Sequence, residues 1–471
     1  MKNTHILIFA AVLLFFANAS AQSYFDTAVL KKHLAYLASD ELGGRYPETD
    51  GGLKAGSYIQ QHYLKLKLKV PCDNGFQNFT FPQNWTVGDS NRAEMSGREL
   101  MVERDYAPLD YFQTRKSFLC SKVIFAKRNA LGSLDSNAFA GKWLMFYDDT
   151  TRNFRKTAFL NAMGKGAAGI LLIVGDVKPE INNILNIPAS KSTDLGPILC
   201  ISKAVADTIL KNAIVLNADS AYLECPVMFS ATTHFVQNHT SARNIVAVLE
   251  GSDPVLKNEY IVVGGHYDHI GTRNVTDRKT GRTETRIYNG ADDNASGTVG
   301  VMMLAEKYAL AGKAPKRSIV FVNFDAEEEG LLGSSHFFDS SMYIKHSQVK
   351  AMINIDMIGR YAEKTGLTVL GIESMREAKE ITKIIQKKSR IKINFPKHSV
   401  LFAGSDHVNF YKHRIPVLFF GTSVHPDYHK PSDTVEKINF TDMQNILSAI
   451  DQVLDNLVNR KRNLTFKELE F

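Results

Sequence analysis

The chain has 471 residues, of which 44% are hydrophobic and 22% are charged. These fractions are close to those of globular proteins and exclude a largely disordered or fibrous chain. The 56 Lys and Arg residues against 49 Asp and Glu residues give a net charge of +7. Because this charge is small for the length and the basic residues are scattered, it does not favour a nucleic-acid-binding protein. The length predicts about three domains, or two with an insertion.

The first 21 residues have the pattern of a signal peptide. Lys2 precedes the apolar run from Ile6 to Ala17, and residues 19–21 form a small-x-small cleavage pattern that makes Gln22 the expected mature N-terminus. This apolar run is short for a membrane span and typical of a secretory signal, although an uncleaved anchor is the alternative. No later apolar run reaches the length of a span. We therefore expect a secreted or periplasmic protein without stable membrane association after cleavage.

The N-terminal half shows two kinds of local pattern. Leucine spacing predicts helices within residues 26–68, interrupted by glycine-containing loops at 43–45 and 50–52. The alternation of apolar and polar residues within 76–105, together with Pro82, predicts edge strands there. Short apolar strands and helices follow. The strands are expected at 142–147, 167–174 and 198–201, and the helices at 159–165 and 203–211.

From residue 241 onward, apolar strands alternate with helices. This alternation predicts an α/β fold in which helices cover both faces of a parallel or mixed sheet. In such sheets, ligands bind at the carboxyl ends of the strands. The strands are expected at 245–249, 260–264, 318–324, 349–355 and 416–420, and the long helices at 297–310, 376–389 and 441–458.

Polar residues of metal-binding types follow the ends of these predicted strands or open a predicted helix. If the strands are parallel, the side chains meet at one edge of the sheet. Imidazoles and carboxylates in one cleft are costly to leave unpaired, and a divalent cation removes this cost. A mixture of His, Asp and Glu suits zinc best. The residues are His266, Asp292, Asp293, Glu327, Glu328, Asp356 and His429.

Five motifs around these residues resemble those of the secreted co-catalytic zinc aminopeptidases, the group that includes aminopeptidase Y and the glutamate carboxypeptidases. Each motif alone is weak, but all five occur in the order of the family. The resemblance implies the zinc exopeptidase fold, a mixed and mostly parallel sheet covered by helices on both faces. The motifs are GGHYDH (264–269), GADDNASG (290–297), AEEEGLLGS (326–334), NIDMIG (354–359) and DYHKPSD (427–433).

The resemblance implies two zinc ions and five ligands. His266 and Asp356 would hold one ion, Glu328 and His429 would hold the other, and Asp293 would bridge them. Asp293 is chosen over Asp292 because it directly precedes Asn-Ala-Ser-Gly, as in the family. The alternative for Asp292 is a helix N-cap.

The resemblance also implies three catalytic roles. Glu327 would be the general base for the metal-activated water, although a one-residue slip that exchanges it with Glu328 stays open. Tyr428 resembles a tyrosine that stabilises the oxyanion, and its alternative is packing beside the ligand loop. Asp268 would accept the other ring N–H of His266 and fix its tautomer. The histidines that match no ligand position are expected to be structural and not ligands: His269, His336, His407 and His425. Of these, His407 follows Asp406 in a segment that resembles a family loop near the cleft, where it would support the ligands without binding the metal.

The same resemblance predicts the domain organisation. Residues 1–21 are the signal peptide, and residues 22–96 form the N-terminal part of the peptidase domain. Residues 97–235 resemble a protease-associated (PA) insert, which commonly acts as a lid or access element. Residues 236–471 form the catalytic zinc peptidase domain.

The leading functional hypothesis is a secreted zinc exopeptidase that removes N-terminal residues from peptides, that is, an aminopeptidase. An acidic cluster can hold the α-ammonium group of a substrate, whereas a carboxypeptidase would need a basic pocket, for which Arg360 or Arg414 are candidates. A glutaminyl cyclase shares this fold and can use one zinc ion, but the insert and the length argue against it. A non-catalytic receptor-like member would typically have lost metal ligands, and here every expected ligand is present.

Overall fold

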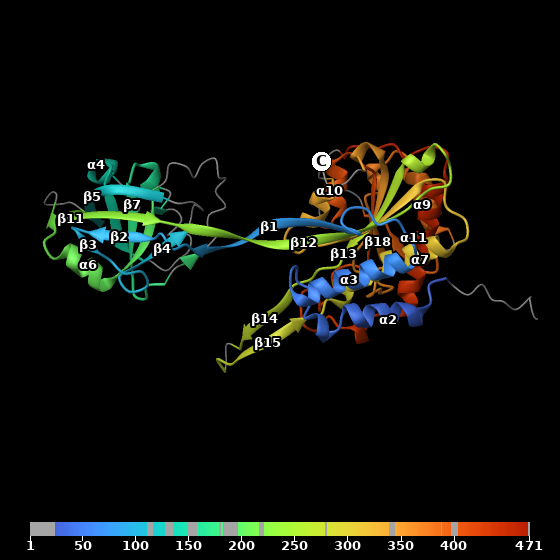
Figure 1. Ribbon diagram of the computed structural model, residues 1–471, viewed down its shortest axis with the longest axis horizontal. Helices are drawn as coiled ribbons and strands as arrows, with labels where there is room; N and C mark the ends of the chain where they lie inside the picture. Colours follow the sequence, from blue (N-terminus) through green and yellow to red (C-terminus); the bar gives the residue numbers. More distant parts are fainter. Residues whose placement is uncertain are drawn as a thin grey trace, which may run out of the picture. The chain divides into compact units, whose positions relative to one another are not determined.

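In the computed structural model, the chain folds into two compact units (Figure 1). The larger unit comprises the chain up to Phe81 and again from Thr240 onward, and the smaller unit spans Pro82–His239. No helix among the described residues combines the length and the apolar character that a membrane crossing requires. The predicted signal peptide lies outside the described residues. These are 24–110, 116–127, 135–148, 158–159, 161–178, 180–181, 196–215, 221–277, 280–338, 344–387, 389–396 and 404–469.

The larger unit is built on an eight-stranded sheet (Figure 1). Its strands, in spatial order, are β1 (Phe76–Val87), β12 (Phe235–Leu249), β16 (Ser318–Phe324), β13 (Tyr260–His266), β17 (Val349–Ile355), β20 (Val417–Gly421), β18 (Leu367–Leu370) and β19 (Ile393–Asn394). The central strands β16, β13, β17 and β20 are parallel to one another. On either side of this group, β12 and β18 pair antiparallel with their neighbours. The sheet is therefore mixed and mostly parallel, and this confirms the predicted fold class.

Both faces of this sheet are buried, because alternate residues of each strand point to opposite sides. Ile245, Ile261 and Ile319 belong to one hydrophobic core, whereas Val246 and Val262 belong to the other. On the second face, Phe410 of α10 (His407–Lys412) and Phe337, which follows α8 (Leu332–His336), complete the packing. The helices on the first face are α2 (Thr27–Leu37), α3 (Asp50–Lys65), α7 (Gly297–Leu310), α9 (Ala378–Gln386) and α11 (Phe440–Asn459).

The first turn of α3 differs from the prediction. The sequence predicts a loop at 50–52, but α3 begins at Asp50, and the Thr49 hydroxyl caps it by accepting the N–H of Gly52 at 3.2 Å. A Cβ atom on Gly51 would lie 1.8 Å from the carbonyl oxygen of Leu42. The glycine is therefore needed for close approach of the helix to the preceding segment, and not for a turn.

Arg45 fastens this N-terminal segment to the loops that follow β13 and precede α7. Its side chain is 1% exposed and donates four hydrogen bonds to main-chain oxygens. The acceptors are Tyr267 at 2.7 Å, Leu37 at 2.6 Å, Asn289 at 2.6 Å and Gly290 at 2.9 Å. One buried guanidinium thus orders segments that are distant in the sequence but adjacent to the candidate site.

We expect Arg45→Met to lower the free energy of unfolding by about 4 kcal/mol, because it leaves buried carbonyl groups without donors. Urea unfolding followed by circular dichroism measures this. The matched control is Arg273→Met, on the exposed strand β14 (Gly271–Thr276), for which we expect a change of about 0.5 kcal/mol or less. Equal effects of the two substitutions would show that Arg45 does not anchor the segment.

The second unit holds a ten-stranded sheet with its own cores on both faces. The predicted strands at 142–147, 167–174 and 198–201 are confirmed by β6, β7 and β9, and the predicted helix at 203–211 by α6 (Lys203–Leu210). The strands are, in spatial order, β3 (Arg98–Glu99), β2 (Arg92–Met95), β11 (Tyr222–Thr233), β5 (Lys116–Ala126), β6 (Trp143–Tyr147), β7 (Gly169–Val174), β9 (Ile198–Ser202), β4 (Tyr106–Asp110) and β8 (Glu180–Ile181), while β10 (Ile214–Val215) pairs with β11.

This unit contains the segment 97–235 for which the sequence predicts an insert. The unit spans Pro82–His239, and β2 pairs with β11 inside it. None of the residues to which the sequence assigns metal binding or catalysis lies in it.

Candidate metal centre

The predicted metal ligands converge at one edge of the larger sheet. His266 is the last residue of β13, and Asp356 directly follows β17. Glu327 and Glu328 lie in the turn after β16, and His429 lies in the loop after β20. Since these four strands are parallel, their carboxyl ends meet at the same edge. The topology therefore brings together residues that are up to 163 positions apart (429 − 266 = 163).

Asp293 lies between two groups of side chains. His266 and Asp356 form the first group, and Glu328 and His429 form the second group. The Nε2 atom of His266 is 3.5 Å from Oδ1 of Asp293 and 3.5 Å from Oδ1 of Asp356. The Nε2 atom of His429 is 3.1 Å from Oδ2 of Asp293 and 3.1 Å from Oε2 of Glu328. Each oxygen of the Asp293 carboxylate thus faces a different histidine. This is the arrangement that a carboxylate bridging two cations requires.

The spacing of these atoms fits zinc. Two ligands at about 2.0–2.1 Å from a tetrahedral ion lie roughly 3.3 Å apart. The distances of 3.1 to 3.5 Å between the facing atoms are close to this value. Buried oxygens Oδ2 of Asp293 and Oδ1 of Asp356 accept no hydrogen bond from the described residues. Buried carboxylates in this condition are suited to coordinate cations.

His269 joins the second group, although the sequence analysis treats it as structural. Its side chain is fully buried, and its Nδ1 lies 2.7 Å from Oε1 of Glu328 and 3.9 Å from Oδ2 of Asp293. His269, Asp293 and Glu328 have potential ligand atoms within 4.8 Å of one another, as do His266, Asp293 and Asp356. The contact leaves Oε2 of Glu328 directed at His429. The only sequence signal for His269 is its position three residues after a ligand.

The other three histidines that are expected to be structural are in contact with residues outside the predicted ligand set. The ring of His336 stacks on Phe79, and the ring of His407 lies against Phe419. His425 places Nε2 3.2 Å from Oδ2 of Asp292.

Asp292 is buried behind the two groups instead of facing them. Its Oδ1 accepts the N–H of Gly359 at 2.6 Å and the hydroxyl of Ser296 at 3.0 Å. It lies inside the helical turn η5 (Ala291–Ser296), and the N-cap of α7 is Ser296. The alternative of Asp292 as a helix N-cap is therefore not what the structure shows. Its contacts shape the turn that presents Asp293.

Two further residues hold this turn in place. The carboxylate of Asp433 accepts the N–H groups of Asp292 and Asp293 at 3.0 to 3.1 Å. Asn294 donates to the carbonyl of Ile355 at 3.1 Å and accepts the N–H of Met357 at 3.1 Å. The turn is thus bonded on both sides to segments that carry metal-site residues. Asp433 and Asn294 lie inside the sequence motifs, but nothing else in the sequence indicates that they hold this turn in place.

Asp268 contacts the site through two different groups. Nδ1 of His266 lies 3.2 Å from its main-chain oxygen and 3.6 Å from its carboxylate. The longer distance exceeds a hydrogen bond, so the carbonyl makes the ring contact that the sequence assigns to the side chain. The carboxylate instead accepts the N–H groups of Glu327 at 3.1 Å and Glu328 at 3.2 Å. Asp268 therefore orients both a histidine and the glutamate turn.

Glu327 and Tyr428 border the metal-site residues. Oε2 of Glu327 lies 3.8 Å from Nε2 of His266. Burial raises the pKa of Glu327 well above its usual value, His266 opposes this rise, and the carboxylates of Asp406 and Asp356 add to it. The Tyr428 ring stacks on His429 with 3.8 Å between ring centroids. Burial and the surrounding carboxylates raise the pKa of Tyr428, so its hydroxyl keeps its proton at neutral pH.

Contacts between carboxylates and imidazoles shift the pKa of Asp293 and the pKa of His429 in opposite directions. Burial raises the pKa of Asp293, but the neighbouring imidazoles of His266 and His429 outweigh this effect and lower it. Burial lowers the pKa of His429, while Asp293 and Glu328 raise it to about 9. The carboxylates of this group are therefore ionised at neutral pH, as metal ligands must be.

A cavity of about 340 Å³ opens beside these residues. One part of its wall is made by the candidate catalytic groups, and another part by apolar side chains. Such a combination of an apolar wall and a few convergent polar groups is typical of a small-molecule or side-chain pocket. The lining residues include His266, Asp293, Glu327, Asp356, Tyr428 and His429 on the polar side, and Met357, Leu370, Phe419 and Val424 on the apolar side.

The chain is similar to several known proteins. Aminopeptidase YwaD of Bacillus subtilis is 31% identical over 211 residues, which are 43% of this chain and 41% of that protein. Leucine aminopeptidase 1 of Trichophyton equinum is 30% identical over 243 residues, which are 49% of this chain and 60% of that protein. The chain thus spans about half the length of these two curated relatives.

A solved structure and a family model extend the comparison. BSAP, a zinc aminopeptidase from Bacillus subtilis, is 20% identical with a TM-score of 0.53, and the match covers 94% of this chain and 99% of BSAP. This likeness supports the fold. The model of peptidase family M28 matches residues 244–454, the range that holds all five predicted metal ligands. Over this range, the chain is therefore similar to peptidase family M28.

Proposed function

We propose that the protein is a secreted zinc aminopeptidase that removes N-terminal residues from peptides. Two zinc ions are held by His266, Asp293, Glu328, Asp356 and His429. The observation that carries this proposal is the Asp293 carboxylate, whose two oxygens face two separate histidines beside a cavity. Secretion rests on the signal-peptide pattern of the first 21 residues.

The chemistry divides between the ions and the chain. Bound zinc supplies Lewis acidity, which polarises the substrate carbonyl and acidifies a water molecule. Glu327 takes a proton from the attacking water and passes it to the leaving amine. A general base works best when its pKa is near the operating pH, and burial shifts the pKa of Glu327 upward from its usual acidic value, in that direction.

Two neighbours complete this arrangement. Tyr428 keeps its proton at neutral pH and lines the cavity, so its hydroxyl is available to donate to the developing oxyanion. Asp268 acts as a positioning residue, because its carboxylate holds the main chain of Glu327 and Glu328. Asp268 itself is not among the residues that line the cavity.

The charges around the cavity favour an aminopeptidase over a carboxypeptidase. The residues that line it include carboxylates but no Lys or Arg. Of the two candidate arginines, Arg360 pairs with Asp427 at 3.1 Å and Arg414 with Glu468 at 3.2 Å. The cavity can therefore bind an α-ammonium group, whereas neither arginine is placed in it to bind a carboxylate.

The apolar wall of the cavity points to the preferred side chain. Leu370, Phe419 and Val424 can exclude water from an aliphatic side chain, and burial of such a chain contributes about 1.5–3 kcal/mol. The name of the leucine aminopeptidase among the relatives agrees with this inference. We therefore propose a preference for apolar N-terminal residues such as leucine.

A panel of small substrates tests the proposed function. We expect hydrolysis of leucyl-p-nitroanilide, much slower hydrolysis of the lysyl and glutamyl anilides, and none of N-acetyl-leucyl-p-nitroanilide, which lacks the ammonium group. A glutaminyl cyclase would instead cyclise peptides that begin with glutamine, and a carboxypeptidase would cleave N-acetylated peptides from the other end. Failure to act on any of these substrates would support the receptor-like alternative.

We further propose that the unit Pro82–His239 contains a PA-like insert that influences substrate access and takes no part in the reaction. All metal-site and catalytic candidates lie in the other unit. A folded deletion variant that binds zinc should still hydrolyse leucyl-p-nitroanilide, with altered discrimination among longer peptides. Its complete inactivity on small anilides would contradict this role.

A further inference from the structure

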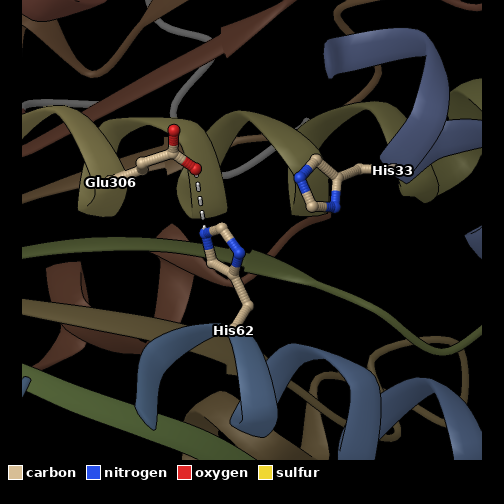
Figure 2. Close-up of side chains that lie close together, drawn as sticks. All are labelled: His33, His62 and Glu306. Atoms are coloured by element: carbon tan, nitrogen blue, oxygen red, sulfur yellow. Dashed lines mark ion pairs between the residues drawn. The ribbon is translucent and has the colours of Figure 1, made fainter. Parts of the chain in front are cut away.

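A second cluster of potential metal ligands lies outside the candidate centre. His33 comes from α2, His62 from α3 and Glu306 from α7, and the three side chains point toward one another (Figure 2). Each can offer one ligand atom such that all three atoms lie within 4.8 Å of one another. Neither the sequence motifs nor the proposed reaction uses any of the three.

One ring nitrogen of each histidine in this cluster is placed to coordinate a cation. Nε2 of His62 is buried and has no hydrogen-bond partner among the described residues. Its distance of 3.6 Å to Oε2 of Glu306 is too long for a hydrogen bond but close to the separation of two ligands on one zinc ion (Figure 2). Nδ1 of His33 lies 2.8 Å from the hydroxyl of Tyr58, which leaves Nε2 as its ligand atom.

Both imidazoles are in the form that binds metals. Burial, followed by the charges of His62 and Lys32, lowers the pKa of His33 to about 4. Burial also lowers the pKa of His62. The two rings are therefore neutral at pH 7, so an ordinary ion pair with Glu306 does not explain the cluster. Glu306 is about one quarter exposed, which leaves an open side for a water ligand.

We propose that His33, His62 and Glu306 form a third divalent-cation site, selective for zinc, with water as its fourth ligand. Two imidazoles and one carboxylate are a ligand set that zinc commonly takes. A cation here would connect α2 and α3 to α7, the helix that follows the turn carrying Asp293. Its role is structural, because it would cross-link three helices and its three ligands are not among the residues that line the cavity of the co-catalytic centre.

The third site is separate from the co-catalytic centre and weaker than it. Glu306 lies nine residues beyond Gly297 (306 − 297 = 9), or about 14 Å along α7 at 1.5 Å per residue. The charges of Lys32 and Lys65 act on His33, and they oppose the approach of a cation. The site also has one carboxylate, whereas the co-catalytic ligands include three. We therefore expect it to fill only after the first two ions have bound.

Equilibrium dialysis of the full-length, chelator-treated protein against zinc, with metal counted by plasma emission spectrometry, tests this site. We expect three equivalents for the wild type, the third at higher free zinc, and two for His62→Gln and for Glu306→Gln. The matched control is His346→Gln, an exposed histidine whose ring lies 5.6 Å from that of His413, and it should keep three equivalents. Circular dichroism establishes that each variant is folded.

Cobalt provides an independent readout, because its absorption bands report ligand geometry at each site. The third equivalent of cobalt should change the spectrum of the wild type but not that of His62→Gln or Glu306→Gln. The activity of both variants on leucyl-p-nitroanilide should equal that of the wild type. The zinc counts and cobalt spectra do not depend on the proposed function. The same zinc count in the wild type and both variants, or an equal loss in His346→Gln, would overturn the third site.

Discussion

Replacing Glu327 with glutamine is expected to slow the hydrolysis of leucyl-p-nitroanilide by about 100- to 10,000-fold, the usual contribution of a positioned general base. The amide has nearly the same shape as the carboxylate but cannot accept a proton. Glu327 borders the ligand groups, with Oε2 3.8 Å from His266, and it lines the cavity. The zinc content should therefore stay unchanged while kcat falls.

Two neighbouring glutamates serve as matched controls for this substitution. Glu329→Gln changes an exposed residue and should leave both activity and zinc content unchanged. Glu328→Gln changes a residue that lies 3.1 Å from His429, and it should weaken zinc binding. If Glu327→Gln lost zinc and Glu328→Gln retained it, the two roles would have to be exchanged.

Replacing Asp293 with alanine is expected to remove both zinc ions and with them all measurable hydrolysis. Its two carboxylate oxygens face His266 and His429, so one substitution damages both groups of ligands. The neighbouring carboxylates of Asp356 and Glu328 would then face the histidines without a shared partner. Plasma emission spectrometry of protein dialysed against metal-free buffer measures the loss.

The two histidines of the second group provide a graded comparison. His429→Gln should cost one of the two ions, because this ring faces both Asp293 and Glu328. His269→Gln should lower zinc affinity by about 10- to 100-fold if the ring only orients Glu328, since that is the usual cost of removing such a support. Asp207→Ala, on the exposed face of α6, should change neither zinc content nor activity. Retention of two ions by Asp293→Ala would contradict the bridging arrangement.

The sheet and the position of the candidate site follow from local patterns. The apolar segments 318–324 and 349–355 correspond to β16 and β17, because strands buried on both faces must be apolar throughout. The prediction of a helix at 297–310 corresponds to α7 for a similar reason, since ten of its residues are buried. Once the strands are parallel, the rule that ligands bind at their carboxyl ends places His266 and Asp356 together.

Features that depend on tertiary contacts could not be predicted in this way. Arg45 bonds to main-chain oxygens, which leave no trace in the identity of the partner residues. Gly51 resembles a loop residue, because the sequence does not show the carbonyl group that approaches it. His33 and His62 each stand alone on a helix, and only the packing of α2 and α3 against α7 brings them to Glu306.

Reconstitution of the chelator-treated protein with zinc, followed by the rate of leucyl-p-nitroanilide hydrolysis at each zinc concentration, tests the central claim most directly. That claim is that a pair of zinc ions shared by Asp293 supports aminopeptidase activity. We predict no hydrolysis without metal, and a rate that rises to its maximum as two equivalents bind. Full activity in protein shown to contain no metal would contradict the account.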